Sequence, residues 1–524
     1  MKGGYPGKHS DVLLIHPPVV RPCEPPPGLA RLAGTLARSG IAYELIDANL
    51  EGLRWLCGLT PEVSDTWTRR AAGRAHRSLD LLSLPETYRS RDRYRQAISA
   101  LNRVLDMNGH GRIHASLTDY RNEALSPTRS ADLIEASRTP ETNIFFPYFE
   151  RRIKAALTES IPAVVGISMN FLSQALCTFA IIGTLKRLAP NVCVILGGGL
   201  VTSWMRQPDF VSPFEGMVDH LIAGPGEAPL LTVLGKRHTG GTALPDYSRI
   251  ASLPYLSPGL ILPYSASNGC YWRRCTFCPE KAEGRPYRPI PTPRAVSQLK
   301  TLASTYHPAL IHLTDNAVSP ALLKALALNP PGAPWYGFTR ITPDLADTDF
   351  CIALKKSGCV MLQLGLESGA QAVLDAFGKG VDLNVAGKAL AAMKQAQIAT
   401  YVYLLFGTPW EKKEDAELTL DYTARHSDAI TFLNLAVFNL PAYGPEAETL
   451  ETHSFYKGDL SLYRAFRHPD GWQRQHVRQF LDKEFTRHPA IAPIVRKDPP
   501  VFTSSHAPFF AQADRRSLSM ERPD

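Results

Sequence analysis

The first part of the chain alternates short apolar runs with stretches whose apolar positions recur at helical spacing. Residues 11–18 (DVLLIHPP) form a continuous apolar run, as expected for a strand buried on both faces of a parallel sheet. Residues 28–40 follow with helical spacing and end on Gly40, a common helix C-cap. The expected strands are 11–18, 42–49, 163–170, 192–199 and 220–227. This order predicts a doubly wound, Rossmann-like parallel sheet that binds ligands at the carboxyl ends of its strands.

Two segments interrupt or end this pattern. Residues 52–160 are rich in arginine and mixed in charge, and their patchy helical spacing predicts a mostly helical insertion. Residues 236–262 are dense in Pro, Gly and Ser and lack any periodic stretch, which is typical of a connector. We therefore expect the first domain to cover residues 1–245.

A second periodic region follows, with six apolar strand candidates separated by helical stretches. The expected strands are 262–267, 309–314, 335–339, 360–366, 400–406 and 429–435. The expected helices are 293–305, 320–328, 347–357, 384–397 and 413–426. Six such units predict a partial (β/α)6 TIM-type barrel over residues 246–440, open on one side because a complete barrel has eight. Residues 441–524 form a small C-terminal extension whose last dozen or so residues we expect to be disordered.

Composition adds limits to this α/β picture. A length of 524 residues fits about three structural units, and 44% hydrophobic with 20% charged residues is typical of a globular protein. The net charge of +8 is spread without a long basic block, so nucleic acid is an unlikely partner. No apolar window is long enough for a membrane span, and the first residues lack the apolar core of a signal peptide. We expect a cytoplasmic protein.

Three of the 9 cysteines lie within one short stretch, GCYWRRCTFC: Cys270, Cys275 and Cys278. The others stand alone, which does not resemble a disulfide framework and favours reduced thiols. Thiolates prefer soft metals, and three clustered ligands without a fourth nearby favour an iron-sulfur cluster with one iron left open. A structural zinc site stays open as an alternative, if the fold brings in Cys359 or His312 as the fourth ligand.

The cysteine stretch, placed at the end of the first barrel strand, resembles the cluster loop of the radical S-adenosylmethionine (SAM) superfamily. The likeness extends through HLTDN (312–316), GFTR (337–340), LGLESG (364–369), FGKG (377–380) and LLFGTPWE (404–411). One feature departs from the family: four residues separate Cys270 from Cys275, where three are usual. The resemblance implies a 4Fe-4S cluster that binds SAM at its open iron, an electron donor such as flavodoxin or ferredoxin, and cleavage of SAM to methionine and a deoxyadenosyl radical.

Residues after the later barrel strands are matched to the parts of SAM. Arg340 is expected to pair with the methionyl carboxylate, and Glu367 and Ser368 to bond ribose hydroxyls or the methionyl amine. Backbone at Gly407 and Pro409 would approach adenine. The alternatives are a surface ion pair for Arg340 and a simple turn at 407–409. With the aromatic residue of the cysteine loop, the expected SAM-binding residues are Phe277, Arg340, Glu367, Ser368, Gly407 and Pro409.

Next to such a barrel, the first domain resembles the cobalamin-binding domain of cobalamin-dependent radical SAM enzymes. The likeness lies in residues 16–49, 165–170, 195–199 and 222–231. No DxHxxG motif is present, so the resemblance implies cobalamin bound base-off without a histidine ligand, and His16 is expected to be structural. The glycine-rich turns do not fit GxGxxG, which makes a dinucleotide unlikely. The expected cobalamin-binding residues are Ser168, Met169, Asn170, Gly197, Gly198, Gly199, Gly226 and Glu227.

The resemblance therefore predicts a cobalamin-dependent radical SAM enzyme, most often a methyltransferase that acts on an unactivated carbon. No residue is assigned to the catalytic step itself, and the substrate is a small molecule or a peptide. Two alternatives stay open. The radical chemistry can end in rearrangement, cyclisation or oxidation, with or without cobalamin, or the cysteines can belong to a zinc-stapled, non-catalytic binding protein.

Overall fold

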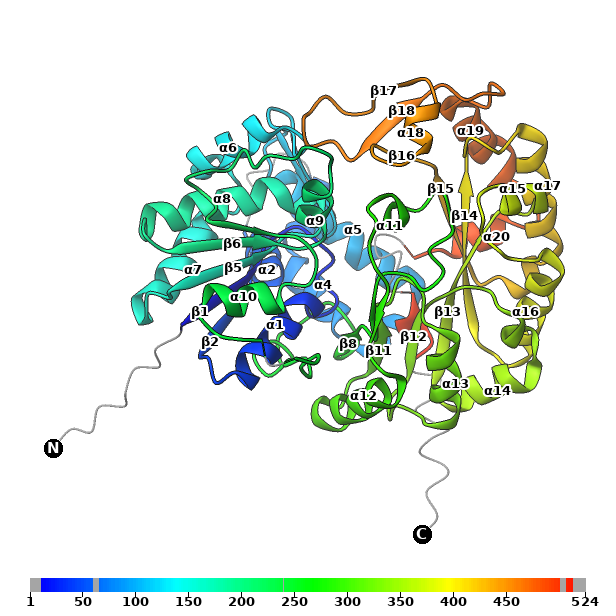
Figure 1. Cartoon of the computed structure of the whole chain (residues 1–524), viewed down its shortest axis with the longest axis horizontal. Helices are drawn as coiled ribbons and strands as arrows, with labels where there is room; N and C mark the ends of the chain where they lie inside the picture. The colour runs from blue at the N-terminus through cyan, green and yellow to red at the C-terminus, as the bar shows by residue number, and fades with distance from the viewer. Residues whose placement is uncertain (1–10, 60–65, 239, 500–505, 512–524) are drawn as a thin grey trace, which may run out of the picture. The chain divides into compact units, whose positions relative to one another are not determined.

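The computed structural model describes residues 11–59, 66–238, 240–499 and 506–511 (Figure 1). The chain divides into two compact units. The first runs up to Pro258 and also includes Tyr456–Ser461, and the second takes Gly259–Phe455 and the chain from Leu462 onward. Both are α/β, as the sequence predicts.

The first unit contains a five-stranded parallel sheet in the order β2-β1-β5-β6-β7. Its strands are β1 (Val12–His16), β2 (Tyr43–Asp47), β5 (Val164–Ser168), β6 (Cys193–Gly197) and β7 (His220–Ile222). Helices α1 (Pro27–Arg38), α8 (Leu172–Leu188) and α9 (Gly199–Met205) lie between them in the sequence, and α10 (Glu227–Val233) follows β7. Strand order reverses between β1 and β5, and the loops that leave a sheet at such a point diverge to form a ligand crevice.

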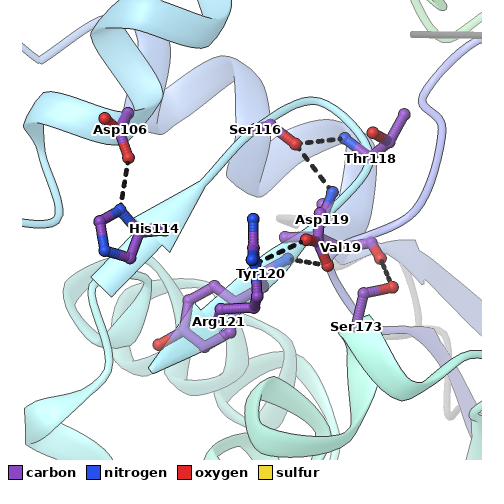
Figure 2. Close-up of polar contacts among 9 residues, drawn as sticks. All are labelled: Val19, Asp106, His114, Ser116, Thr118, Asp119, Tyr120, Arg121 and Ser173. Atoms are coloured by element: carbon purple, nitrogen blue, oxygen red, sulfur yellow. Dashed lines mark hydrogen bonds and ion pairs between the residues drawn. The ribbon is translucent and has the colours of Figure 1, made fainter. Parts of the chain in front are cut away.

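The insertion is helical with one hairpin. Its helices are α2 (Ala48–Cys57), α3 (Thr66–Ala72), α4 (Ala75–Leu82), α5 (Arg91–Met107), α6 (Ser130–Arg138) and α7 (Phe146–Glu159). Strands β3 (Ile113–Ala115) and β4 (Tyr120–Asn122) form the hairpin shown in Figure 2. The hydroxyl of Ser116 accepts the amides of Thr118 and Asp119 at 3.2 and 2.9 Å, which fixes the turn locally and explains a hairpin within a helical pattern.

The second unit contains a six-stranded parallel sheet whose strands follow chain order, which confirms the partial barrel. Its strands are β8 (Ile261–Tyr264), β11 (Leu310–Leu313), β12 (Trp335–Thr339), β13 (Cys359–Glu367), β14 (Ala399–Phe406) and β15 (Phe432–Val437). The helices are α12 (Thr292–Tyr306), α13 (Pro320–Leu328), α14 (Thr348–Lys356), α15 (Gln371–Ala376), α16 (Leu383–Gln395) and α17 (Lys413–Arg425). Strands β8 and β15 are the two edges, so within the described residues the sheet does not close.

The C-terminal extension contains a small antiparallel sheet and short helices. They are β16 (Leu440–Pro441), α18 (Glu446–Thr449), β17 (Thr452–Ser454), β18 (Tyr463–Phe466), α19 (Arg474–Phe480) and α20 (Ala492–Lys497). Further on, Ala507 and Ala511 pack against the first residues of the barrel strands, in one cluster with Ile261 and Phe432. Residues 507–511 thus fill the amino end of the barrel, opposite the end that carries the cysteine loop, whereas Trp472 and Val477 contact the turn after β14 at the carboxyl end. The expected disorder at the chain's end falls outside the described residues.

In the described part of the chain, no helix combines the length and the apolar character that a bilayer crossing needs.

Candidate active site

The three clustered cysteines follow β8 at the carboxyl end of the barrel sheet. A short antiparallel ladder between β9 (Ser267–Asn268) and β10 (Arg288–Pro289) closes the base of their loop. Asp315, in the HLTDN stretch, anchors this base: its carboxylate accepts the Ala266 amide at 3.0 Å and the Ser267 hydroxyl at 2.5 Å. Asp315 is buried, and burial raises the pKa of its carboxyl. Asp315 therefore fixes the backbone at the start of the cysteine loop.

The extra residue between Cys270 and Cys275 is absorbed by a left-handed backbone at Arg273, whose φ is 53°. The spacer also carries Trp272, whose indole N–H donates to the Gly378 carbonyl at 2.8 Å. A Cβ on Gly380 would lie 2.2 Å from the Trp272 ring, so only glycine fits there. The FGKG loop, which follows α15, therefore packs directly against the cysteine loop.

Arg340, at the end of β12, is buried with 4% of its surface exposed. One guanidinium nitrogen donates to the Cys275 sulfur at 3.8 Å, another donates to the Lys379 carbonyl, and the guanidinium lies 4.1 Å from the Trp272 ring centre. No carboxylate among the described residues lies within ion-pair distance of it. The alternative that Arg340 takes part in a surface ion pair is therefore wrong. A buried cation without an anionic partner is costly, which indicates a place for an anionic ligand.

Glu367 and Lys379 form a buried ion pair beside Arg340, with 2.7 Å between Lys379 Nζ and Glu367 Oε1. Glu367 adopts a φ of 73° at the end of β13, after a register shift that begins at Gly365. A Cβ on Gly365 would lie 2.7 Å from Lys379 Nζ, so this glycine leaves the room for the pair. Two cations against one carboxylate leave a charge of +1 here. The sequence reasoning missed Lys379, and its only signal was a lysine between two glycines.

The other expected SAM residues surround this group. Phe277 packs edge-on against Phe377, with 4.9 Å between ring centres. Ser368 is buried and its hydroxyl bonds the Thr419 hydroxyl at 3.2 Å and the Ala370 amide at 3.1 Å, so its side chain already has partners.

Gly407 and Pro409 lie in the turn after β14, where Gly407 has a φ of 74° and donates its amide to the buried carboxylate of Glu411. Arg340, Glu367 and Gly407 thus end three neighbouring strands at one edge of the sheet. Their roles toward SAM stay predictions.

Burial and nearby charge act in opposite directions on the cysteine thiols. Burial raises the pKa of Cys275, while Lys379 and Arg340 lower it. Burial raises the pKa of Cys278 to about 11. Among the described residues, no group of three or more His, Cys, Asp or Glu side chains surrounds a single-ion position.

The fourth zinc ligand considered from the sequence is not at the cysteine loop. Cys359 begins β13 in register with Trp335, at the amino end of the sheet, whereas the loop leaves the carboxyl end. His312 lies within β11 and stacks on Tyr336 at 4.4 Å between ring centres. The fold therefore does not provide the ligand set of a closed zinc site from these two residues.

In the first unit, Ser168, Met169 and Asn170 lie at the end of β5, as expected. Met169 is fully buried, so its side chain belongs to the core. Asn170 uses its amide group internally: its oxygen accepts the Gly199 amide at 2.9 Å and its nitrogen donates to the Ser168 hydroxyl at 3.2 Å. Side chains expected to contact cobalamin are thus bonded to one another.

The glycines at the end of β6 differ from one another. Gly198 has a φ of 111°, and a Cβ there would lie 2.3 Å from the Met169 carbonyl oxygen, so protein packing alone requires this glycine. Around Gly197 and Gly199 the nearest atoms would lie at 3.5 and 3.6 Å, which is ordinary contact.

Gly226 and Glu227 begin α10 beyond β7. A Cβ on Gly226 would lie 3.4 Å from the Leu32 side chain. Glu227 is ion-paired with Arg31 at 2.5 Å, which ties α10 to α1. The cobalamin roles of these two residues also stay predictions.

The end of β1 holds a histidine with unused hydrogen-bonding capacity. His16 is buried, burial lowers the pKa of its imidazole, and its Nδ1 atom has no hydrogen-bond partner among the described residues. It pairs in register with Asp47 on β2. The sequence reasoning treated this residue as structural, and the structure places it at the switch point of the sheet.

Comparisons with known proteins agree with this geometry. Residues 264–423 match the family model described as "Radical SAM superfamily". The anaerobic magnesium-protoporphyrin IX monomethyl ester cyclase of Cereibacter sphaeroides is 23% identical over 275 residues, which cover 44% of this chain and 44% of that protein. The uncharacterized methyltransferase PH0819 of Pyrococcus horikoshii is 21% identical over 304 residues, 50% of this chain and 64% of that protein. The matches thus span 44% and 64% of the lengths of these two relatives.

Solved structures share the fold. The radical SAM methyltransferase TsrM of Kitasatospora setae, with cobalamin and a [4Fe-4S] cluster bound, matches with a TM-score of 0.52 and 18% identity over 86% of this chain and 78% of TsrM. The cobalamin-dependent radical SAM enzyme OxsB, with aqua-cobalamin bound, matches with a TM-score of 0.51 and 14% identity over 99% of this chain and 63% of OxsB. These likenesses extend over both units of the chain.

Proposed function

Residues 264–423 of this chain form a radical SAM domain, and from that premise we propose that the protein is a cobalamin-dependent enzyme that methylates an unactivated carbon of a small molecule or peptide. The observation that carries the proposal is the buried Arg340 guanidinium, in contact with Cys275 and without a carboxylate partner among the described residues. The proposal places the reaction in the cytoplasm, with flavodoxin or ferredoxin as the electron donor.

The residues at the cysteine loop fit a 4Fe-4S cluster with SAM. Cys270, Cys275 and Cys278 offer three soft ligands, which leaves one iron of such a cluster open. The excess positive charge of Arg340 and Lys379 over Glu367 suits a negatively charged cluster and the carboxylate of SAM. When bound, the cluster supplies the electron that cleaves SAM to methionine and a deoxyadenosyl radical.

The chain's own residues would position SAM. Arg340 would hold the methionyl carboxylate by charge-assisted hydrogen bonds, and Glu367, with Lys379 on one oxygen, would accept from the amine or ribose with the other. Backbone at Gly407 and Pro409 would face adenine, with Phe277 packing nearby. The phenylalanines and the indole around the loop would exclude water from the reacting atoms.

The first unit fits cobalamin through backbone and shape. The switch point between β1 and β5 is where a doubly wound sheet binds ligands. Because Asn170 is bonded to Gly199 and Met169 is buried, contacts there would come mainly from loop backbone at Ser168 and at Gly197–Gly199, with Gly226 and Glu227 at the next loop. Cobalamin would supply the methyl group. The likeness to TsrM and OxsB, both described with cobalamin bound, supports this assignment.

A second candidate is radical ring closure, which the match to a cyclase from Cereibacter sphaeroides favours. In that case the radical step is retained and no methyl group reaches the product.

Anaerobic purification with hydroxocobalamin, followed by incubation with methyl-labelled SAM, a reductant and candidate substrates, tests the proposal. We expect about four irons per chain, bound cobalamin, deoxyadenosine and label in the product. The Cys275→Ala variant should lose iron and both products, while Cys351→Ala, which changes a buried cysteine of α14, should retain them. Deoxyadenosine without label transfer would favour ring closure. A protein that binds no iron and forms neither deoxyadenosine nor labelled product would contradict both candidate functions.

A further inference from the structure

The spacer between Cys270 and Cys275 places one aromatic side chain at the meeting point of three segments. Trp272 contacts the Arg340 guanidinium through its ring face at 4.1 Å and the Gly378 carbonyl through its indole N–H at 2.8 Å. The exposed Arg274 guanidinium also lies over the ring, at 4.9 Å. Gly380 has no Cβ, which leaves room for the indole.

The 377–380 loop is also bonded to the cysteine loop and to Arg340 through its backbone carbonyls. The Thr276 amide donates to the Phe377 carbonyl at 3.0 Å, and Arg340 donates to the Lys379 carbonyl. Within the FGKG loop, the amides of Gly378 and Lys379 bond the carbonyls of Asp375 and Leu374 at 3.0 and 2.9 Å. The loop that carries Lys379 is therefore held from both sides, by its own helix and by the cysteine loop.

We propose that Trp272 is a positioning residue, which the additional residue of the spacer makes possible. Its ring and its N–H hold Arg340 and the 377–380 loop against the cysteine loop, so the guanidinium stays on Cys275 before any ligand arrives. The proposal rests on the proposed function. It names the side chain that keeps the cation in place, where no carboxylate among the described residues does so.

The geometry explains why the spacer needs four residues. Arg273 adopts a left-handed φ of 53°, which changes the direction of the backbone between Trp272 and Arg274 locally. With this backbone conformation, the indole reaches the Gly378 carbonyl while Cys275 stays beside Arg340. Two consequences follow: the Arg340 hydrogen bond to the cysteine sulfur raises the reduction potential of a bound cluster, and the fixed guanidinium binds the SAM carboxylate without prior rearrangement.

Three variants separate these contacts. Trp272→Leu removes the ring face and the N–H donor. Trp272→Phe keeps an aromatic face for Arg340 and loses only the bond to Gly378. Arg274→Gln, the matched control, removes the exposed cation from the same ring and leaves Arg340 untouched.

The first readout needs no cluster. Hydrogen exchange in the iron-free protein should accelerate about tenfold at the Gly378 and Lys379 amides in Trp272→Leu, and less in Trp272→Phe, with Arg274→Gln equal to wild type. The second uses the reconstituted protein. Trp272→Leu should lower the cluster's midpoint potential and weaken SAM binding about tenfold, with Trp272→Phe restoring most of both.

Wild-type exchange at these amides together with a wild-type potential in Trp272→Leu would overturn the proposal. So would equal effects in Trp272→Leu and Arg274→Gln, because the contact to Arg340 would then carry no special weight. A wild-type protein that binds no iron would contradict the proposed function, while the exchange data would still decide whether Trp272 holds the 377–380 loop.

Discussion

At the end of β12, the Arg340 guanidinium is buried beside Cys275 with no carboxylate near it among the described residues, whereas at the end of β5 the Asn170 amide bonds both Gly199 and Ser168. The barrel loops carry a charge that a ligand can balance. At the end of β5, the polar side chains are instead bonded to each other and to the backbone. We therefore expect a ligand to be recognised by charge at the end of β12 and by backbone and shape at the end of β5.

The largest expected effect is the loss of the cluster ligand in the barrel. Cys275→Ala removes one of three thiolates, so we expect iron content to fall from about four per chain to well below one, with loss of deoxyadenosine formation. Iron analysis and the visible spectrum measure this. Cys23→Ala, at a buried cysteine of the first unit, should retain full iron. Equal iron in both variants would contradict the assignment of the cysteine loop.

The next effect tests whether a glycine of the first unit serves packing. Gly198→Ala puts a Cβ 2.3 Å from the Met169 carbonyl oxygen at a φ of 111°, so we expect a loss of about 3 kcal/mol or more in the free energy of unfolding. Gly199→Ala meets nothing closer than 3.6 Å and should change it by less than about 1 kcal/mol. Denaturant unfolding of both variants measures the difference. If Gly199 faces cobalamin, its variant should still bind cobalamin more weakly.

Removal of the Arg340 guanidinium tests whether the barrel recognises its ligand by charge. Arg340→Met should weaken SAM binding about 10- to 100-fold, because a charge-assisted hydrogen bond to a carboxylate is worth about 1.5–3 kcal/mol. Arg274→Met, which removes an exposed guanidinium that lies 4.9 Å from the centre of the Trp272 ring, should leave the affinity near wild type. Equilibrium binding of SAM to the reconstituted protein measures both. An unchanged affinity in Arg340→Met would show that this cation does not meet the ligand.

The smallest effect concerns Glu411, a buried carboxyl after β14 that accepts from the Gly407 amide and the Trp472 indole at 3.1 Å. Burial raises its pKa from 4.5 to about 8. The folded protein therefore keeps a proton that the unfolded chain releases, and stability falls as the pH rises through this interval.

Between about pH 7 and about pH 8, wild type should lose about 1 kcal/mol that Glu411→Gln, which cannot ionise, retains. Thermal unfolding of both proteins across this range measures the difference. Parallel pH profiles would mean that Glu411 is already ionised at the lower pH.

The sequence predicted the barrel strands well because buried parallel strands form continuous apolar runs between helices of regular spacing. Lys379 was not predicted as a site residue because its burial depends on Gly365 and on the backbone conformation at Glu367, two features of tertiary packing. The sequence also gave no sign that Met169 would be buried or that Gly198 would be required by a carbonyl. A strand end rich in glycine and polar residues has the same pattern whether a ligand or the protein itself occupies it.

We propose that Cys270, Cys275 and Cys278 hold a 4Fe-4S cluster whose open iron binds SAM. Electron paramagnetic resonance of the anaerobically reconstituted, reduced protein tests it directly, with and without SAM. We predict the signal of a reduced cluster, a change in that signal when SAM is added, and no such signal in Cys275→Ala. A colourless protein that holds zinc, or a cluster signal that SAM leaves unchanged, would contradict this assignment of the three cysteines.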